Sequence, residues 1–512
     1  MTDFLFGQSY YLHFDPKLLE AMQPYPPLGT MYAASTLREE GYEVALFDAM
    51  LAESEAEWAA QLASHRPRFA VIYEDNFNYL SKMCLLRMRE AAFTMIESAQ
   101  AEGCTVIVCG SDATDHAEGY LEAGADFVLL GEGEATLVEL AARLTAQSTT
   151  PFDEIQGLAW QSDDGPRRNP RRGDIKDVDA LPFPAWDLID VERYRRIWLD
   201  HHGYFSMNMV TTRGCPYHCN WCAKPIWGQR YNSRSPENVV AELKWLKATY
   251  HPDHIWFADD IVGLKPRWWS RFADLVEAEG VRTPFKCLSR ADLLLRDGDI
   301  PALARAGCDI VWIGAESGAQ HVLDRMEKGT KVEQIYEAAA RLHDAGVRVG
   351  FFLQFGYPGE TRADIEKTIQ MVRDCEPDDI GMSVSYPLPG TKFYERVKSE
   401  LGTKQNWQDS SDLAMLYEGP FSTDFYRQLH TVLHKEYRSR KRWQALANAV
   451  QRPATLRPTH LLGAGKAGYH WLTLPWARRK LDALAHASGD GLTALAPALS
   501  HEESATPTPQ ER

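Results

Sequence analysis

The sequence SMNMVTTRGCPYHCNWC at residues 206–222 decides how the rest of the chain can be interpreted. It starts as a β-rich run and then brings Cys215, Cys219 and Cys222 into one loop with the spacing C-x3-C-x2-C. Three thiolates suit a four-iron cubane cluster whose fourth iron stays open to a substrate, whereas clusters for electron transfer usually have four cysteine ligands. The alternative is tetrahedral zinc with His218 as the fourth ligand, although adjacent residues such as His218 and Cys219 seldom bind one metal.

Six segments with strand character lie between residues 205 and 400, and a helical pattern follows each of the first five. This alternation predicts a parallel sheet, and six units predict a partial (β/α)6 barrel with its active groups on the loops after the strands. The predicted strands are SMNMVTT (206–212), HIWFAD (254–259), FKCLS (285–289), DIVWIGA (309–315), VRVGFFLQFG (347–356) and DIGMSVSY (379–386).

Residues 1–148 show the same alternation, which predicts a flavodoxin-like (Rossmann-like) parallel sheet with helices on both faces. Such a sheet binds ligands at the carboxyl ends of its strands. The predicted strands are DFLFGQS (3–9), YEVALFD (42–48), FAVIYED (69–75), TVIVCGS (105–111) and DFVLLGE (126–132).

The rest of the chain lacks this rhythm. Residues 149–204 are polar and rich in proline and glycine, which predicts a linker that contains a loop or hairpin. Residues 401–490 have helical patterns and predict an α-helical C-terminal region, while the polar segment 491–512 predicts a disordered tail. The fold class is therefore α/β, with a flavodoxin-like domain, a partial barrel and a helical end.

The cysteine spacing resembles the signature CxxxCxΦC of the radical SAM superfamily, with Trp221 at the aromatic position Φ. The resemblance implies a [4Fe-4S] cluster held by the three cysteines. It also implies that S-adenosylmethionine (SAM) binds the fourth iron and is cleaved reductively to a 5′-deoxyadenosyl radical. The electron would come from a donor such as ferredoxin or flavodoxin. Trp221 is a candidate for contact with these cofactors.

Polar residues at the ends of the other barrel strands fit the same resemblance. Asp259 and Asp260 follow the second strand and are candidates for the SAM amino group, although the family's Gly-Gly-Glu motif is absent and Asp260 could instead cap a helix. Arg290 could bind the SAM carboxylate or form a structural salt bridge. Glu316, in WIGAESG, is a candidate for a SAM contact, and Gln354 either faces the barrel interior or only packs.

PPLGTMYAASTLREEGYEVALFDA (26–49) and GADFVLLGEGEATLVELAARL (124–144) resemble the cobalamin-binding domain that precedes the barrel in one large radical SAM subgroup. Gly131 and Gly133 would let a nucleotide-like tail approach the backbone. The histidine motif Asp-x-His-x-x-Gly is absent, since His13 in YYLHFDP does not match it, so no protein ligand to cobalt is predicted. The alternative is a domain that only supports the barrel. The loop after the third strand could face the corrin or the substrate with Tyr73, Asp75, Asn76 and Asn78.

The resemblance to cobalamin-dependent radical SAM enzymes implies the modification of an unactivated carbon in a small or lipid-like metabolite, with C-methylation as the leading prediction. Oxidative cyclisation, as in the anaerobic magnesium-protoporphyrin IX monomethyl ester cyclase, is the alternative. Methylthiolation is a third reading, but Cys84, Cys104 and Cys109 lack the spacing for a second cluster. A corrin carrier or electron donor would leave the open iron without a purpose.

Composition limits the partners of this 512-residue chain. Its net charge of −16 argues against nucleic acid, because phosphate binding needs a basic surface. Residues 421–480 are an exception, with 12 Lys/Arg against 2 Asp/Glu and several tryptophans, which predicts either a solvated helical face or peripheral contact with a membrane. Nine cysteines without an export signal, and no apolar run of roughly 18 residues, predict a cytoplasmic protein.

Overall fold

The computed structural model describes residues 2–222, 226–402, 406–410, 412–452 and 457–492. The chain divides into two compact units, which are described separately. The first contains Met1–Phe355 and Asp364–Tyr417, and the second contains Gly356–Ala363 and Glu418–Arg512. Both predicted sheets belong to the first unit.

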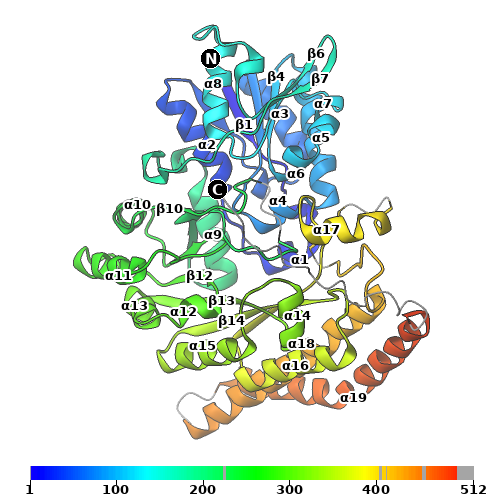
Figure 1. Cartoon of the computed structure of the whole chain (residues 1–512). Helices are drawn as coiled ribbons and strands as arrows, with labels where there is room; N and C mark the ends of the chain where they lie inside the picture. Colours follow the sequence, from blue (N-terminus) through cyan, green and yellow to red (C-terminus); the bar gives the residue numbers. More distant parts are fainter. Residues whose placement is uncertain (1, 223–225, 403–405, 411, 453–456, 493–512) are drawn as a thin grey trace, which may run out of the picture. The chain divides into compact units, whose positions relative to one another are not determined.

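The N-terminal sheet has the predicted flavodoxin-like arrangement (Figure 1). Its first five strands are all parallel and stand in the order β2-β1-β3-β4-β5, so the prediction is confirmed. The central strands are buried because helices cover both of their faces. The bounds are β1 (Phe4–Gly7), β2 (Val44–Leu46), β3 (Phe69–Tyr73), β4 (Thr105–Cys109) and β5 (Phe127–Leu129).

Two apolar clusters, one on each face of this sheet, hold the helices in place. One cluster joins the sheet to α3 (Glu55–His65), α5 (Leu86–Ala101) and α7 (Ala117–Glu122), and the other joins it to α2 (Leu28–Glu39) and α8 (Glu134–Leu144). Short helices lie in the loops between strands and helices. These are α1 (Pro16–Ala21), α4 (Tyr79–Met83) and α6 (Ser111–Asp115).

The predicted linker 149–204 adds two strands to the first sheet. β6 (Leu158–Ser162) pairs antiparallel with β5, and β7 (Gly165–Arg168) pairs with β6 as a hairpin. Only the first three residues of β6 are buried, so the hairpin carries little of the apolar alternation by which a strand is recognised. The sheet therefore extends to residue 168, and α9 (Val191–His202) precedes the barrel.

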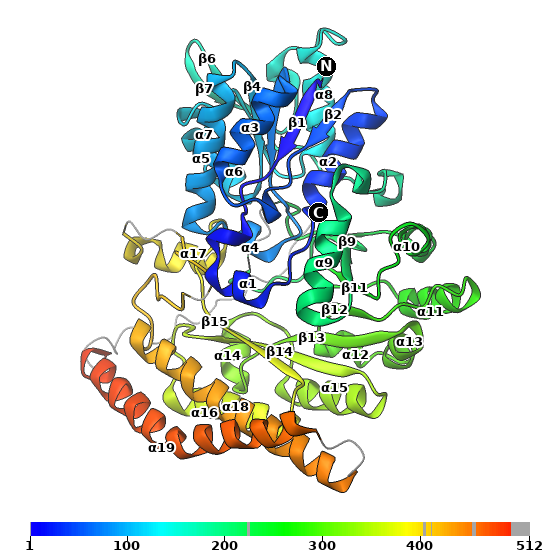
Figure 2. The same cartoon turned by 180° about the vertical axis from the view of Figure 1, so that it is seen from behind.

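The second sheet is the predicted six-stranded partial barrel, and all of its strand pairs are parallel (Figure 2). The order β15-β14-β13-β12-β11-β8 follows the chain from one edge to the other, so the sheet stays open. The strands are β8 (Ser206–Met209), β11 (His254–Phe257), β12 (Phe285–Ser289), β13 (Cys308–Glu316), β14 (Arg348–Phe355) and β15 (Asp379–Val384). The helices between or after them are α10 (Pro236–Tyr250), α11 (Trp268–Ala278), α12 (Ala291–Leu294), α13 (Asp299–Ala306), α14 (Gln320–Arg325), α15 (Val332–Asp344), α16 (Arg362–Cys375) and α17 (Lys392–Val397).

Side chains alternate between the two faces of the barrel strands, as the period of two requires. Phe257 and Phe285 are buried against Phe272 of α11 on the outer, helix-covered face. Their neighbours Trp256 and Lys286 therefore point to the interior of the barrel, where both are only half-buried. The interior face thus has room for a ligand.

In the second unit, α18 (Thr423–Gln451) and α19 (Pro458–Leu492) form an antiparallel pair. Gln428 donates to Ala477 O at 2.9 Å, and Ser439 donates to Ala467 O at 3.1 Å. The helical prediction for this region is confirmed, and no helix in the described residues is long and apolar enough to cross a membrane. Of the predicted tail, residues 491–492 end α19 and residues 493–512 lie outside the described residues.

Candidate functional site

The cysteine loop leaves the barrel at the carboxyl end of β8. A short antiparallel ladder closes its base, because β9 (Thr212–Arg213) pairs with β10 (Asn232–Ser233). Gly214, the first residue of the loop, has φ +78°, and a Cβ atom there would lie 2.5 Å from Arg230 O, so only glycine fits. The sequence analysis did not predict this ladder, because two-residue strands carry no periodic signal.

The three predicted ligands share this loop. Cys219 is buried, and Cys215 and Cys222 are half-buried. None of the nine cysteines, all of which are described, forms a disulfide. Within the described residues, no three His, Cys, Asp or Glu side chains lie in a metal-binding arrangement, and the loop continues from Cys222 into residues 223–225, which lie outside them.

The chemistry of this donor set fits an iron–sulfur cluster, because three thiols stand within eight residues of one loop. The ring nitrogen Nδ1 of His218, the fourth ligand in the zinc alternative, is hydrogen-bonded to Gln229 Oε1. Trp221 has a buried Nε1 atom without a hydrogen-bond partner among the described residues. Its predicted contact with the cofactors is not tested by this structure and stays a prediction.

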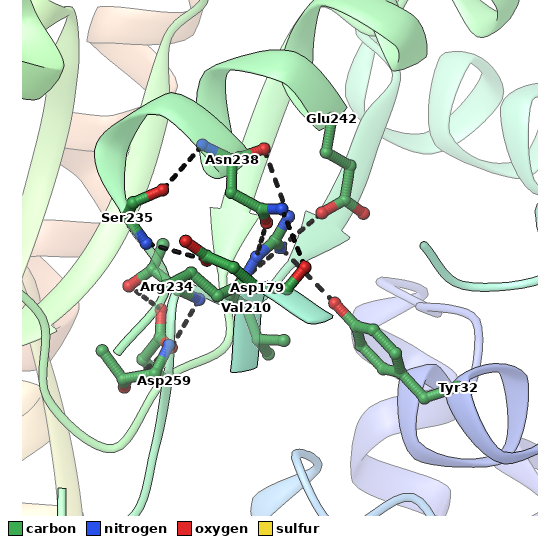
Figure 3. Close-up of polar contacts among 10 residues, drawn as sticks. Tyr32, Asp179, Val210, Arg234, Ser235, Asn238, Glu242 and Asp259 are labelled. Atoms are coloured by element: carbon green, nitrogen blue, oxygen red, sulfur yellow. Dashed lines mark hydrogen bonds and ion pairs between the residues drawn. The ribbon is translucent and has the colours of Figure 1, made fainter. Parts of the chain in front are cut away.

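Asp259 fixes the strand end that leads into the cysteine loop (Figure 3). Its carboxylate accepts hydrogen bonds from the backbone N–H groups of Thr211, at 2.7 Å, and Thr212, at 2.5 Å. Both threonine hydroxyls donate to it as well, at 3.1 and 2.9 Å. Burial raises the pKa of Asp259 to about 7, although these hydrogen bonds lower it. The structure thus gives Asp259 a positioning role, and its predicted contact with SAM stays a prediction.

The neighbouring Asp260 forms an ion pair at 2.6 Å with Lys82 of α4 in the N-terminal domain. The predicted cap of a helix is absent, because residues 260–264 have no helical structure. The pair ties the loop after β11 to the loop after β3. A contact between Asp260 and SAM stays a prediction.

A buried ion pair between Arg234 and Glu242 lies beside the same strand end (Figure 3). Arg234 Nη1 donates to Val210 O at 2.8 Å, and its backbone N–H donates to Thr211 O at 2.9 Å. The same nitrogen Nη1 lies 3.4 Å from the hydroxyl of Tyr32 in α2. The pair therefore holds β8 and contacts the N-terminal domain at one point.

Arg290, the candidate for the SAM carboxylate, stacks on the cysteine loop. Its guanidinium lies 3.6 Å from the ring centroid of Tyr217. It also forms an ion pair with Asp292 at 2.9 Å and donates to Lys328 O and Thr330 Oγ1, each at 2.9 Å. The alternative of a structural salt bridge is therefore present in the structure, while the predicted contact with SAM is not tested.

Glu316 and Lys328 form a second buried ion pair at 2.7 Å. Glu316 has φ +56° and stands where the register between β13 and β14 shifts, so its side chain is re-aimed. Burial lowers the pKa of Lys328, but the negative charges of Glu316 and Cys219 outweigh burial and raise it. Lys328, which the sequence analysis missed, thus lies near a predicted cluster ligand. Gln354 is buried and donates to Ser385 Oγ at 3.1 Å.

The two glycines at the carboxyl edge of the first sheet stand where side chains of this protein pack closely against the backbone. A Cβ atom at Gly131 would lie 2.4 Å from Arg171 Nε, and one at Gly133 would lie 2.6 Å from Cys109 Sγ and 2.9 Å from the Tyr73 ring. The space above both glycines is therefore filled by these side chains. Their predicted role toward a nucleotide-like tail stays a prediction, and the structure supplies a separate reason for them.

The glutamates next to these glycines form ion pairs that could not be predicted from the sequence. Arg213 forms buried ion pairs with Glu132, and with Glu134 at 2.9 Å. All three side chains are at most 5% exposed. Arg213 stands two residues before Cys215, so the triad joins the edge of the first sheet to the base of the cysteine loop. The charges are visible in RGC and GEGE, but their pairing across 80 residues is not.

The loop after β3 completes this edge. Asp75 accepts from Gly29 N at 3.0 Å and Phe77 N at 3.2 Å, and Asn78 caps α4 by accepting from Leu80 N at 2.9 Å. Two buried oxygen atoms, Asn76 Oδ1 and Ser111 Oγ, have no hydrogen-bond partner within the described parts of the chain. Unpaired buried polar groups at the ligand-binding edge of such a sheet fit a polar ligand, as cobalamin would be.

Two family profiles match the two sheets of the first unit. The Radical SAM superfamily profile matches residues 209–372, which include the cysteine loop and most of the barrel. The B12 binding domain profile matches residues 18–141 of the flavodoxin-like domain. Together they assign both domains. The chain is a cobalamin-dependent radical SAM enzyme.

Relatives of this radical SAM enzyme match between 78% and 88% of its length. An uncharacterised methyltransferase of Pyrococcus horikoshii is 26% identical over 419 residues, which are 80% of this chain and 87% of the relative. The anaerobic magnesium-protoporphyrin IX monomethyl ester cyclase of Synechocystis is 24% identical over 88% of this chain and 86% of its own. The radical SAM methyltransferase TsrM of Kitasatospora setae has the same fold, with a TM-score of 0.63, 19% identity and 78% of each chain covered.

Membership of this family defines the cofactors. The enzyme uses a [4Fe-4S] cluster, SAM and cobalamin, as the sequence analysis predicted. The zinc alternative is thereby removed. The domain boundaries and the contacts of individual residues with these cofactors stay predictions.

Proposed function

We propose that the enzyme replaces a hydrogen on an unactivated carbon of a small or lipid-like molecule by a methyl group. The observation that carries this proposal is the triad of Arg213, Glu132 and Glu134. It fastens the ligand-binding edge of the cobalamin domain to the base of the cysteine loop. Such a transfer needs both cofactors next to one substrate, and fixed positioning is the main contribution that a protein makes to it.

In this proposal, Cys215, Cys219 and Cys222 hold the cluster. When bound, the cluster and SAM would supply the chemistry for removing the hydrogen, and cobalamin would supply the methyl group. A small electron-transfer protein such as ferredoxin or flavodoxin delivers the electron.

Several residues of the barrel then position the cofactors. Arg290, Glu316 and Gln354 line the SAM side of the barrel interior, with Trp221 beside the cluster. Asp259 supports the strand end through Thr211 and Thr212.

Methylation is the leading candidate because methyltransferases with this domain order are among the relatives. The methyltransferase of Pyrococcus horikoshii matches 80% of this chain over 87% of its own length. Oxidative cyclisation is the second candidate, because the cyclase matches 88% of this chain.

The test is an anaerobic incubation of the reconstituted enzyme with SAM, a low-potential reductant, cobalamin and an extract of candidate metabolites. Mass spectrometry then compares the products with and without SAM labelled in its methyl group. We expect a product heavier by one methylene that carries the label. Incorporation of oxygen from labelled water without a methyl group would instead identify a cyclase.

Two cysteine variants control this test. Cys222→Ala removes a proposed cluster ligand and is expected to abolish both the visible absorbance of the cluster and the cleavage of SAM. Cys104→Ala, a buried cysteine in the cobalamin domain whose thiol donates only to Pro67 O, is expected to keep both. Equal behaviour of the two variants would contradict the proposed ligand set.

We also propose that α19 lies against anionic lipid. Four apolar side chains of α19 are between 63% and 76% exposed, and their spacing of seven, three and four residues puts them on one side of the helix: Leu462, Tyr469, Leu472 and Trp476. Co-sedimentation with vesicles should increase with the fraction of anionic lipid. Binding that ignores lipid charge would remove this proposal.

A further inference from the structure

A cavity of about 190 Å³ lies in the first unit, between the N-terminal residues and the barrel. Its walls are mostly apolar or aromatic, with Leu12, Leu18 and Met50 on one side and Trp256 and Lys286 on the barrel side. A cavity of roughly 150 Å³ is large enough for a benzene ring, so this one accommodates a ring with a small substituent. It is too small for a whole ligand of ordinary size, for which roughly 300–1,000 Å³ is typical. It therefore suits one end of a larger molecule.

The cavity is a built part of the fold. Residues 24–26 cross the barrel strands and are fixed at three points, since Trp198 Nε1 donates to Pro24 O at 2.8 Å and Asn208 Nδ2 donates to Pro26 O at 2.9 Å. Between them, the hydroxyl of Tyr25 lies 2.9 Å from Ser206 Oγ. The ring of Tyr25 packs on Trp256 with a centroid distance of 4.7 Å. The aromatic walls are thus held in place from both sides.

Lys286 is the cation of this cavity, and no acidic side chain in the described ranges forms an ion pair with it. Its ammonium group makes no ion pair or hydrogen bond with any described residue. The other interior cations do have partners, since Arg290 is paired with Asp292, and Lys328 with Glu316. The carboxylate of Asp75, which also lines the cavity, is occupied by two backbone N–H groups. A charge without a partner in an apolar cavity costs stability unless a ligand neutralises it.

Aromatic rings compensate Lys286 only in part. Its Nζ atom lies 5.0 Å from the ring centroid of Tyr25 and 4.8 Å from that of Trp256. Such contacts make up only part of the hydration that a half-buried ammonium group loses. Burial lowers the pKa of Lys286 to about 8, and the negative charge of Asp379, which raises it, does not outweigh burial. The position is poised for an anion.

We propose that this cavity binds the carboxylate-bearing, ring-containing end of the substrate, with Lys286 as its counter-ion. A single ammonium group suits a monoanion, because a phosphate dianion would leave a net negative charge buried next to Asp75. The aromatic walls select a ring over a flexible chain. That the bound molecule is the substrate rests on the proposed function, while the carboxylate preference of the cavity does not.

The position of Lys286 also orients the substrate. Lys286 and Arg290 stand four residues apart on the strand β12 and the residue after it, which is about 13 Å at the usual rise of a strand. The carboxylate would therefore lie toward the amino end of the barrel, and the reacting carbon toward the SAM side. The site would act on a carbon remote from the acid group.

The test compares indole-3-acetate with its neutral amide, indole-3-acetamide, as probes of the same shape. Equilibrium dialysis with the reconstituted, full-length enzyme gives both dissociation constants. We expect the acid to bind about ten- to hundredfold more tightly than the amide, because hydrogen bonds to charged groups are worth this much. In Lys286→Gln and Lys286→Met the ratio should fall to about one, while the amide keeps its affinity. Lys244→Gln, at an exposed lysine paired with Glu279, should leave the ratio unchanged.

Four results would overturn the proposal. The first two are that the wild-type enzyme binds neither probe, or that it shows no preference for the acid. The third is that the preference survives in both Lys286 variants. The fourth is that both variants lose the amide together with the acid, which would mean that Lys286 only supports the aromatic walls of the cavity. Because probe binding needs neither SAM nor an electron, this test can fail while methyl transfer succeeds, and the reverse.

Discussion

The carboxyl edge of the first sheet and the interior face of the second sheet differ in whether their charged side chains have partners. At the first edge, Glu132 and Glu134 are paired with Arg213, and Glu74 accepts from Ser9 N through both oxygens at 3.1 and 3.2 Å. In the barrel, Lys286 forms no ion pair with any residue that the structure describes, and it is only half-buried.

The difference shows that one topological rule gives two kinds of edge. Parallel sheets collect polar residues where their strands end, but these residues can be used by the protein or left for a ligand. At the first edge, the charged side chains form ion pairs that hold the cobalamin domain and the barrel together. The barrel leaves a cation and aromatic surface uncovered, as a substrate site requires.

The largest effect is expected from breaking the Arg213 ion pairs at the carboxyl edge of the first sheet. Arg213→Met leaves two buried glutamates without a cation, which should lower the local free energy of unfolding by about 3–5 kcal/mol. Hydrogen exchange of residues 127–134 and 206–213 measures it. The triple variant Arg213→Met, Glu132→Gln, Glu134→Gln should recover much of the loss, because it removes the charges together. A loss below about 1 kcal/mol in the single variant would break the comparison.

A second experiment concerns pH and Asp259. Its pKa of about 7 in the folded enzyme exceeds the ordinary value of 3.8, so its contribution to stability is complete below pH 4 and is lost as the pH rises through 7. Relative to Asp259→Asn, the wild-type enzyme should therefore gain about 2–3 kcal/mol between pH 8 and pH 5. Thermal melting at each pH measures this difference. Asp259→Ala should destabilise at every pH, because it leaves two buried N–H groups unpaired.

A third experiment adds a methyl group to the interior face of the barrel sheet. A Cβ atom at Gly350 would lie 2.5–2.8 Å from ring atoms of Trp312, whose ring stacks on Phe352 at 4.6 Å. Gly350→Ala should therefore cost about 1–3 kcal/mol in the free energy of unfolding, measured by denaturant titration. Gly119→Ala, in a helix with no atom within 4 Å of the new Cβ, should be neutral or slightly stabilising. Equal costs would mean that Gly350 does not sit under a packed ring.

The smallest effect is expected at the second contact between the two domains. Lys82 and Asp260 are partly exposed, so a double-mutant cycle with Lys82→Met and Asp260→Asn should give only about 0.2–1 kcal/mol, decreasing with salt. A coupling free energy as large as the loss expected for Arg213→Met would contradict the distinction between buried and exposed ion pairs.

The sequence predicted those features whose signal is local. The two parallel sheets followed from alternating patterns, and the cluster and SAM followed from the spacing of three cysteines within eight residues. That these three cysteines are the cluster ligands stays a prediction. For the segment 149–204 the sequence left a loop and a hairpin open, because only Leu158, Ala159 and Trp160 are buried in the hairpin at 158–168. Its polar residues look like any loop.

Pairing across space could not be predicted. Arg213 and Glu132 are 81 residues apart, and Asp259 bonds Thr211 across 48 residues. The proposed anion-binding role of Lys286 is harder still to predict, since it depends on the distance of the carboxylates from this lysine in the fold. Only the folded arrangement shows that the lysine in FKCLS is not paired with a carboxylate of the described part of the chain.

The ladder between β9 and β10 also bears on how the enzyme is assembled in the cell. Asn220, in the loop above this ladder, donates from its backbone N–H to Met326 O at 3.0 Å and from its side chain to Arg325 O at 2.7 Å. The described part of the loop that carries the cysteines is therefore held by contacts that exist only in the folded barrel. We expect iron and sulfide to be inserted after the barrel has formed.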